Sequence, residues 1–158
     1  MVWRVVARLG NAARCEHAGV EEGTARARLE PDTQERIVAL RRQLGVSTFG
    51  LNQLVLGPGQ RGRIHRHEHQ EEVFLVLEGE LTLLVEREQS TLAPGELIRV
   101  APPLRRQLVN RGPARLVLLA LGGSGEHAGR DGEAFASWED ERGLAPAEVP
   151  LPPDLPAA

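Results

Sequence analysis

The chain contains no lysine and no tyrosine, and it has a single cysteine, Cys15. Without lysine there is no Schiff-base residue and no lysine general base, so these two kinds of catalysis are excluded. One cysteine cannot form a disulfide within the chain, and no charged segment followed by an apolar one opens the sequence, so export is not indicated. All 19 basic residues are arginine. In such a composition a single arginine is weak evidence for function.

Long apolar runs and an excess of positive charge are also missing. No run approaches the roughly 20 apolar residues that span a bilayer, so we expect a soluble, cytoplasmic protein without a membrane partner. The net charge of -3 gives no reason to expect a nucleic-acid partner, because such binding usually needs a basic face. With 158 residues, of which 41% are hydrophobic, the chain fits one domain with a real core.

From Ser47 to Leu121 the sequence divides into short strand-like segments separated by glycine, proline or charged residues. In chain order these segments are STFGLNQLVL, RIHRHEH, VFLVLEG, ELTLLVE, ELIRVAP, RQLVN and ARLVLLALG. Several short strands with turn signals between them indicate an all-β sandwich or barrel. The run LVLLAL is apolar on both faces, so we expect it between two packed layers or at a subunit interface.

The flanking regions give weaker patterns. Residues 1–34 show no sustained period and are expected to form an irregular N-terminal arm before a barrel at residues 35–121. Within residues 35–45, apolar spacings of three and four favour a short helix ended by Gly45, and a strand followed by a turn fits the same residues equally. Residues 122–158 are expected to hold a flexible connector, a turn of helix and a Pro-rich tail, either loose or laid over the barrel or a neighbour.

Three of the five histidines lie within RIHRHEHQEE, residues 63–72. Residues two apart on a strand share a face, so His65 and His67 are expected to project together. Two imidazoles and a carboxylate from the next strand would form a two-His, one-carboxylate metal site with open coordination positions. The alternative is that the pair is polar surface on an edge strand. The spacing alone does not choose between these interpretations.

The residues around this pair, PGQRGRIHRHEHQEEVFLVLEGE, resemble the first signature of the cupin superfamily. That signature is a glycine, five residues, H-x-H, three or four residues, a glutamate, six residues and a second glycine. Glu71 competes for the carboxylate position, but the spacing to the second glycine selects its neighbour. The positions are held here by Gly59, His65, His67, Glu72 and Gly79. The resemblance implies a cupin-type double-stranded β-helix, or jelly-roll, barrel that cradles a metal through these two His and Glu72, with a third His from a second signature.

The second cupin signature is only partly matched, by APGELIRVAPPLRRQLVNRGPARL. It runs as P-x-G, two residues, His, three residues and Asn, shortly after a PGD-like turn. The turn at 94–96 and Asn110 match in kind, but Arg106 stands at the histidine position and Pro103 at the glycine. Arginine stays protonated and has no lone pair to donate, so Arg106 cannot ligate a metal, and its charge opposes a cation.

Three arrangements remain open at this point. In the first, His65, His67 and Glu72 hold a divalent metal, and Arg106 pairs with an anionic substrate. In the second, His69 or water fills the vacant position. In the third, no metal is held, and Arg106 forms an ion pair with Glu72 inside a binding pocket. A further interpretation places Arg106 on the ordinary surface of an arginine-rich protein.

Strand alternation extends the predicted pocket. Arg106, Leu108 and Asn110 would share a face, so Arg106 and Asn110 are expected to bind substrate, and Arg99 is expected to line the pocket beside them.

For the other candidate residues we expect different positions. Gln53 and Phe74 are plausible wall positions by strand parity. His69 is expected to face solvent, and His17 and His127 lie in Gly- and Ala-rich loops where surface positions are expected.

The sequence therefore predicts a small-molecule cupin with a two-His, one-Glu site for Fe, Zn, Mn or Ni. An oxygenase or isomerase acting on an anionic substrate is the leading hypothesis, with Glu71 or a bound water as the nearest proton acceptor. The alternative is a metal-free ligand-binding or sensory barrel without catalytic activity, because a fold does not determine a function. The apolar strands also lead us to expect a homodimer.

Overall fold

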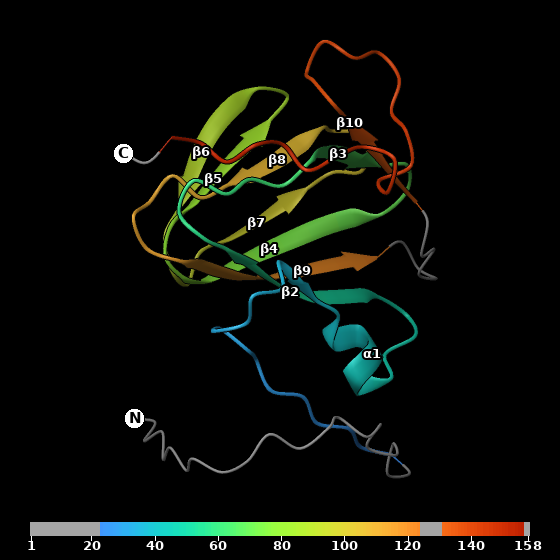
Figure 1. The fold of residues 1–158 in the computed structure, drawn as a ribbon. Helices are drawn as coiled ribbons and strands as arrows, with labels where there is room; N and C mark the ends of the chain where they lie inside the picture. The colour runs from blue at the N-terminus through green and yellow to red at the C-terminus, as the bar shows by residue number, and fades with distance from the viewer. Residues whose placement is uncertain (1–22, 124–130, 157–158) are drawn as a thin grey trace.

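Two five-stranded antiparallel sheets pack face to face, as the computed structural model of residues 23–123 and 131–156 shows (Figure 1). The strand orders are β1-β2-β9-β4-β7 and β10-β3-β8-β5-β6. The strands are β1 (Ile37–Val38), β2 (Gly50–Leu56), β3 (Ile64–His67), β4 (Glu71–Glu78), β5 (Leu81–Val85), β6 (Glu88–Leu92), β7 (Leu97–Val100), β8 (Arg106–Val109), β9 (Leu116–Gly123) and β10 (Gly132–Phe135). The predicted all-β barrel of two packed sheets is confirmed.

The alternation of side chains along the strands fills the space between the sheets. On β4, Glu72, Phe74 and Val76 face inward, and the register sets Phe74 beside Ala120 and Val76 beside Leu118 of β9. The apolar members of these rows pack against inward residues of the other sheet. The core comprises Leu56, Phe74, Val76, Leu81, Leu83, Leu92, Val100, Leu108, Leu116, Leu118 and Ala120. Glu72 is thus a charged residue at the polar end of an otherwise apolar row.

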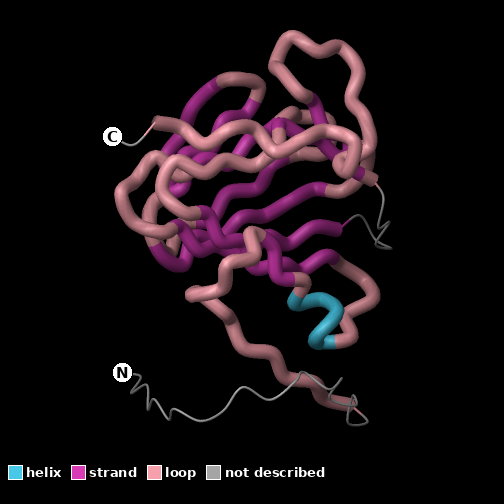
Figure 2. The backbone as a smooth tube through the Cα atoms, viewed as in Figure 1, coloured by secondary structure: helices cyan, strands magenta, loops and turns pink. Residues whose placement is uncertain are grey.

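Both alternatives for residues 35–45 are partly right. Ile37–Val38 pairs with β2 as the short edge strand β1, and helix α1 (Leu40–Leu44) follows directly. The helix ends at Gly45, which takes a left-handed conformation with φ 66°. In Figure 2, α1 lies outside the strands and is the one helix of the described residues. No helix in this part of the chain has the length and apolar character needed to cross a bilayer.

The C-terminal region differs from the predicted turn of helix. Gly132–Phe135 forms strand β10, which pairs with β3 through Ala134 opposite His65, and a hydrogen-bonded turn follows around Ser137. Ala134 and Phe135 are both buried, because β10 closes the edge of the second sheet. A strand paired to a sheet satisfies its backbone groups there, which an isolated helical turn could not do.

The Pro-rich tail lies along the barrel. The N–H of Leu155 donates to the carbonyl of Gly59 at 2.8 Å, and the Nε of Arg61 donates to the carbonyl of Pro153 at 2.8 Å. Val149 is buried beneath the tail's path, and Arg63 donates to its carbonyl. Of the arrangements expected for the tail, the one laid over the barrel is therefore observed.

The two glycines that bracket the histidine motif are backbone requirements. Gly79 ends β4 with φ 76°, and a Cβ there would collide with the carbonyl oxygen of Arg115. Gly59 has φ 74°, and a Cβ there would lie 2.7 Å from the carbonyl oxygen of Leu155. Only glycine adopts such conformations without strain and also permits this close approach.

Replacement of Gly79 by alanine is expected to destabilise the fold by more than backbone strain alone. Gly95→Ala is the matched control, because Gly95 also has a positive φ, 89°, but an added Cβ would meet nothing within 4 Å. We expect Gly95→Ala to cost about 1–2 kcal/mol and Gly79→Ala to cost more, measured by urea unfolding. Equal losses for the two variants would contradict the close packing assigned to Gly79.

Candidate metal-binding site

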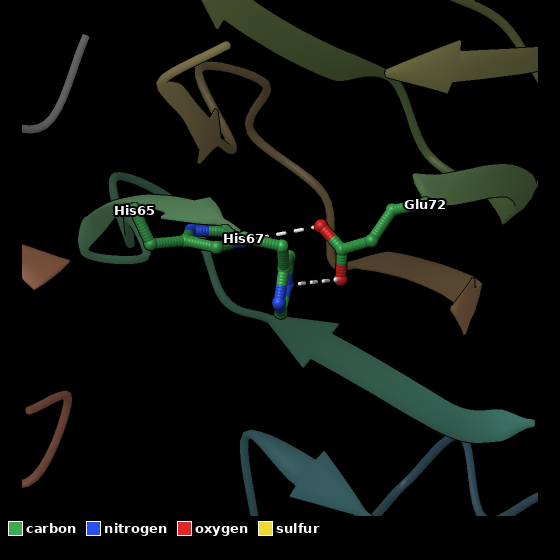
Figure 3. Close-up of side chains that lie close together, drawn as sticks. All are labelled: His65, His67 and Glu72. Atoms are coloured by element: carbon green, nitrogen blue, oxygen red, sulfur yellow. Dashed lines mark hydrogen bonds and ion pairs between the residues drawn. The ribbon is translucent and has the colours of Figure 1, made fainter. Parts of the chain in front are cut away.

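Two histidines and a glutamate converge between the two sheets. His65 and His67 project together from β3, and Glu72 points toward them from β4 of the facing sheet (Figure 3). The Nε2 of His65 lies 3.3 Å from Oε2 of Glu72, and the Nε2 of His67 lies 3.3 Å from Oε1. The predicted pairing of the H-x-H histidines on one face is thus present, and their edge-to-face rings lie 5.7 Å apart between centroids.

The Glu72 carboxylate is held in its ionised form. Burial alone would raise its pKa, but the hydrogen bonds and charges of His65 and His67 outweigh burial and hold the pKa far below its usual range. Because each carboxylate oxygen faces a different imidazole, both oxygens are used. A permanently charged carboxylate with two convergent ring nitrogens is a donor set that suits a divalent cation.

Arg106 reaches the same carboxylate from β8. It stands directly opposite His65 in the β3–β8 register, it is fully buried, and its Nε lies 3.2 Å from Oε2 of Glu72. Its Nη1 donates to the carbonyls of Pro102 and Leu104 at 3.3 and 2.9 Å. Burial lowers the pKa of Arg106, whereas the charges of Glu72 and Asp131 raise it. The interpretation of Arg106 as ordinary surface is wrong.

Asp131 is a second carboxylate at this site, which the sequence did not predict. Its Oδ2 lies 3.6 Å from Nδ1 of His67, on the side of that ring away from Glu72. It accepts from the backbone N–H of Gln70 at 2.8 Å and from that of His69 at 3.1 Å. Burial raises its pKa, but these hydrogen bonds hold the pKa below its usual value. No spacing pattern pointed to Asp131, because it follows a Gly-rich stretch.

The donor set fits a divalent metal. One ligand atom from each of His65, His67 and Glu72 can be chosen so that all lie within 4.8 Å of one another, which one ion can bridge. The positive charge of Arg106 opposes such an ion, but the nearby negative charge of Asp131 offsets it. Asp131 also lies 3.6 Å from Nδ1 of His67, a charge contact that is longer than a hydrogen bond.

Arg99, predicted to line the pocket, and Glu71, predicted as the nearest proton acceptor, are on the outer face instead. Arg99 lies opposite Val73 in the β4–β7 register, on the side of the sheet away from Glu72, and it pairs with Glu71. The expectation that Arg99 lines the pocket is therefore corrected, because strand alternation turns it outward. Glu71 points outward for the same reason, so it is not the proton acceptor nearest the histidines.

Asn110 has a structural role rather than a position in the cavity. Its Nδ2 donates to the carbonyls of Leu56 and Ala114 at 2.9 and 2.8 Å, and its Oδ1 accepts from the N–H of Gly112 at 3.0 Å. These bonds occupy its polar atoms and hold the turn between β8 and β9. The structure gives Asn110 no free group for a substrate, which corrects the expectation.

The remaining candidate residues lie in different parts of the structure. Gln53 points away from the cluster, and its Oε1 accepts from the N–H of Glu30, so it is no pocket wall. Phe74 is part of the core between the sheets. His69 faces solvent as expected, with 67% of its side chain exposed. His17 and His127 lie outside the described residues.

A cavity of about 260 Å³ opens beside the two histidines. Its walls come from both sheets and from the C-terminal tail, and they are mainly aliphatic. Neither Glu72 nor Arg106 is among the lining residues, so the imidazoles separate these charges from the cavity. The lining comprises Arg36, Ile37, Leu54, Leu56, Gly62, Arg63, His65, His67, Leu108, Gly132, Ala134, Pro146 and Leu151.

Comparisons with known proteins agree with this architecture. A family model described as "Cupin domain" matches residues 52–122. A sugar phosphate isomerase of the cupin superfamily from Silicibacter pomeroyi superposes with a TM-score of 0.58 at 25% identity, covering 73% of this chain and 79% of that one. A cupin protein from Bacteroides fragilis gives a TM-score of 0.57 at 18% identity, covering 77% of this chain and 98% of that one.

A search of curated proteins gave no match. The matched range nevertheless contains the histidine pair, Glu72 and Arg106, together with strands β3 to β8 and most of β2 and β9. The two packed sheets, the motif that they present and these matches agree on one assignment. Residues 52–122 match the cupin domain family, and the fold around them is that of cupin-superfamily proteins.

Proposed function

We propose that this protein is a small-molecule cupin that holds a divalent metal through His65, His67 and Glu72. The observation that carries the proposal is the convergence of both Nε2 atoms on the two oxygens of one ionised carboxylate. Fe, Zn, Mn and Ni all suit such a donor set, and the bound ion would supply Lewis acidity at the ends of the two imidazoles.

The protein's own residues would prepare this site before any ligand arrives. Asp131 adds negative charge behind His67, and the carbonyl of Arg63 lies 3.2 Å from Nδ1 of His65. Arg106 contributes charge rather than a direct contact, because its side chain is fully buried behind the cluster. A fixed positive charge at this place favours an anionic ligand at the site.

The chemistry proposed is that of an oxygenase or an isomerase. Isomerase activity gains support from the Silicibacter pomeroyi protein, a sugar phosphate isomerase of the same superfamily. Oxygenase activity gains support from the donor set, because two histidines and a carboxylate leave coordination positions open for oxygen and substrate. Oxygen-uptake and isomerisation assays on metal-loaded protein would separate the two activities.

Protein purified without an affinity tag or chelator is expected to bind about one metal ion per chain, measured by elemental analysis. Each of the variants His65→Ala, His67→Ala and Glu72→Gln removes one donor. Each should weaken metal binding more than about 100-fold, because changes to residues that only support metal ligands already cost about 10- to 100-fold. Glu88→Gln is the matched control, since Glu88 is exposed on β6, at the edge of the second sheet opposite β3 and β10. Equal metal content in all four variants would contradict the assigned ligands.

A metal-free binding barrel is the second candidate, and one contact favours it. Arg106 already pairs with Glu72 at 3.2 Å, so the guanidinium can take the place of a cation beside the carboxylate. In that case the cluster would be a fixed ion pair within a ligand pocket, without catalytic activity. The two candidates differ in what replacement of Arg106 does to metal affinity.

Arg106→His is expected to tighten zinc binding at least tenfold, because it removes an opposing charge and adds a donor opposite His65. A competition titration against a chelator measures the change, and thermal unfolding verifies that the variant folds. Arg99→His is the matched control, because Arg99 lies on the outer face and should leave the affinity unchanged. Unchanged zinc affinity in a folded Arg106→His protein would favour the metal-free barrel.

We further propose that the protein is a homodimer that pairs through the outer face of the first sheet. Leu119, Leu75 and Leu97 lie side by side across β9, β4 and β7 on this face. Leu97 is 62% exposed, and Leu77 on the same face is also exposed. An apolar row across three strands is a surface that burial against a second copy would stabilise.

Light scattering coupled to size exclusion is expected to give a dimer mass for the full chain. Leu97→Arg should yield monomers at the same concentration, since it would bury a charge within the contact. Leu104→Arg, at another exposed leucine, is the control and should remain dimeric. A monomeric parent protein would rule out this assembly.

A further inference from the structure

The cavity beside the histidines is built for an apolar body rather than for a polyhydroxylated one. Leu54 and Leu56 of β2 face it from the first sheet, and Leu108 of β8 faces it from the second. Ala134 of β10 and Leu151 of the tail complete the apolar wall. His65 and His67 are the polar side chains at its inner end.

Each of the two arginines of the lining has part of its guanidinium engaged. Arg36 donates to the carbonyl of Arg61 and pairs with Asp154, and Arg63 donates to the carbonyl of Val149. The tail and the β2–β3 connection hold part of each guanidinium, and the remaining N–H groups add positive charge beside the aliphatic stems. An anionic ligand suits this charge, but along the leucine and alanine walls a set of ligand hydroxyls would find few partners.

From these contacts we propose that the ligand of this site is a small monocarboxylic acid with an aliphatic or single-ring apolar body. Its carboxylate lies at the His65 and His67 end, and its body lies against Leu54, Leu56 and Leu108. This inference goes beyond the proposed function and does not depend on the metal, because both Nε2 atoms face Glu72, on the side of the imidazoles away from the cavity. It departs from the sugar phosphates of the similar Silicibacter pomeroyi protein.

Hydroxyl groups decide between these two classes of ligand. Each hydroxyl buried without a hydrogen-bond partner costs about 1–3 kcal/mol, so a sugar with several hydroxyls would bind poorly against leucine and alanine side chains. A methylene group buried in the same place contributes favourably instead. The same walls therefore disfavour a sugar phosphate and favour an alkyl or aryl acid.

The volume sets the size of the ligand. The cavity holds about 260 Å³. An apolar cavity of about 150 Å³ is enough to bind benzene. A six-carbon chain or one aromatic ring with its carboxylate therefore fits, and a long fatty acid does not.

The wild-type protein alone can test the inference with a homologous series. Zinc-loaded protein is titrated by calorimetry with propionate, butyrate, pentanoate and hexanoate, with benzoate and with glucose 6-phosphate. We expect affinity to rise about fourfold per added methylene, as burial of one methylene predicts, and glucose 6-phosphate to bind more weakly than hexanoate. A flat series, or tighter binding of the sugar phosphate, would overturn the proposal.

Leu151 allows a variant test with little risk to folding, because it is 44% exposed. Leu151→Glu places a carboxylate in the cavity wall and should weaken hexanoate binding by more than tenfold, while propionate changes less. Leu29→Glu is the matched control, since Leu29 is 38% exposed and is not part of the lining. Equal effects of the two variants would contradict the placement of the ligand's body.

Metal-stripped protein separates this inference from the proposed function. The dependence on chain length comes from the apolar walls and should persist without metal. If the protein binds no metal but keeps the fourfold step, the metal proposal fails and the ligand class stands. If it binds metal but shows no step, the ligand class fails and the metal proposal stands.

Discussion

The buried Glu72 carboxylate is the group on which the rest of the site depends. A carboxylate inside a barrel is costly unless charged partners surround it, and here two imidazoles and a guanidinium do so. His65, His67 and Arg106 come from one sheet, whereas Glu72 comes from the other. The contact between the sheets is therefore electrostatic at this end of the barrel and apolar at the other, where the leucine core lies.

The replacement of a third histidine by arginine changes the charge balance of the cluster. A histidine would add a neutral donor, but Arg106 adds a full positive charge next to the carboxylate. Asp131 restores the balance from outside the motif, since it approaches His67 and also lowers the electrostatic penalty on Arg106. Arg106 lies on β8, and Asp131 lies just before β10. Their opposite charges reduce the electrostatic cost of placing each of them in this interior.

The C-terminal tail forms part of the wall of the cavity beside the histidines. Its backbone is tied to Gly59 through Leu155 and to Arg63 through Val149. In Figure 1 the red tail runs across the second sheet, close to β3 and β8. Glycine is therefore required at position 59 for a second reason besides its positive φ. A side chain there would displace the tail that forms part of the wall.

The sequence by itself determined the strands, the H-x-H pair on one face and the choice of Glu72, because these follow from local alternation and fixed spacing. It could not decide where Arg99 and Asn110 point. A short strand can present either face, and an asparagine near a turn serves equally as a ligand group or as a backbone partner. Tertiary structure alone brought Asp131 behind His67, turned residues 132–135 into a strand and laid the tail over the cavity. Those contacts join segments about 60 to 90 residues apart in the chain, where no local pattern carries information about proximity.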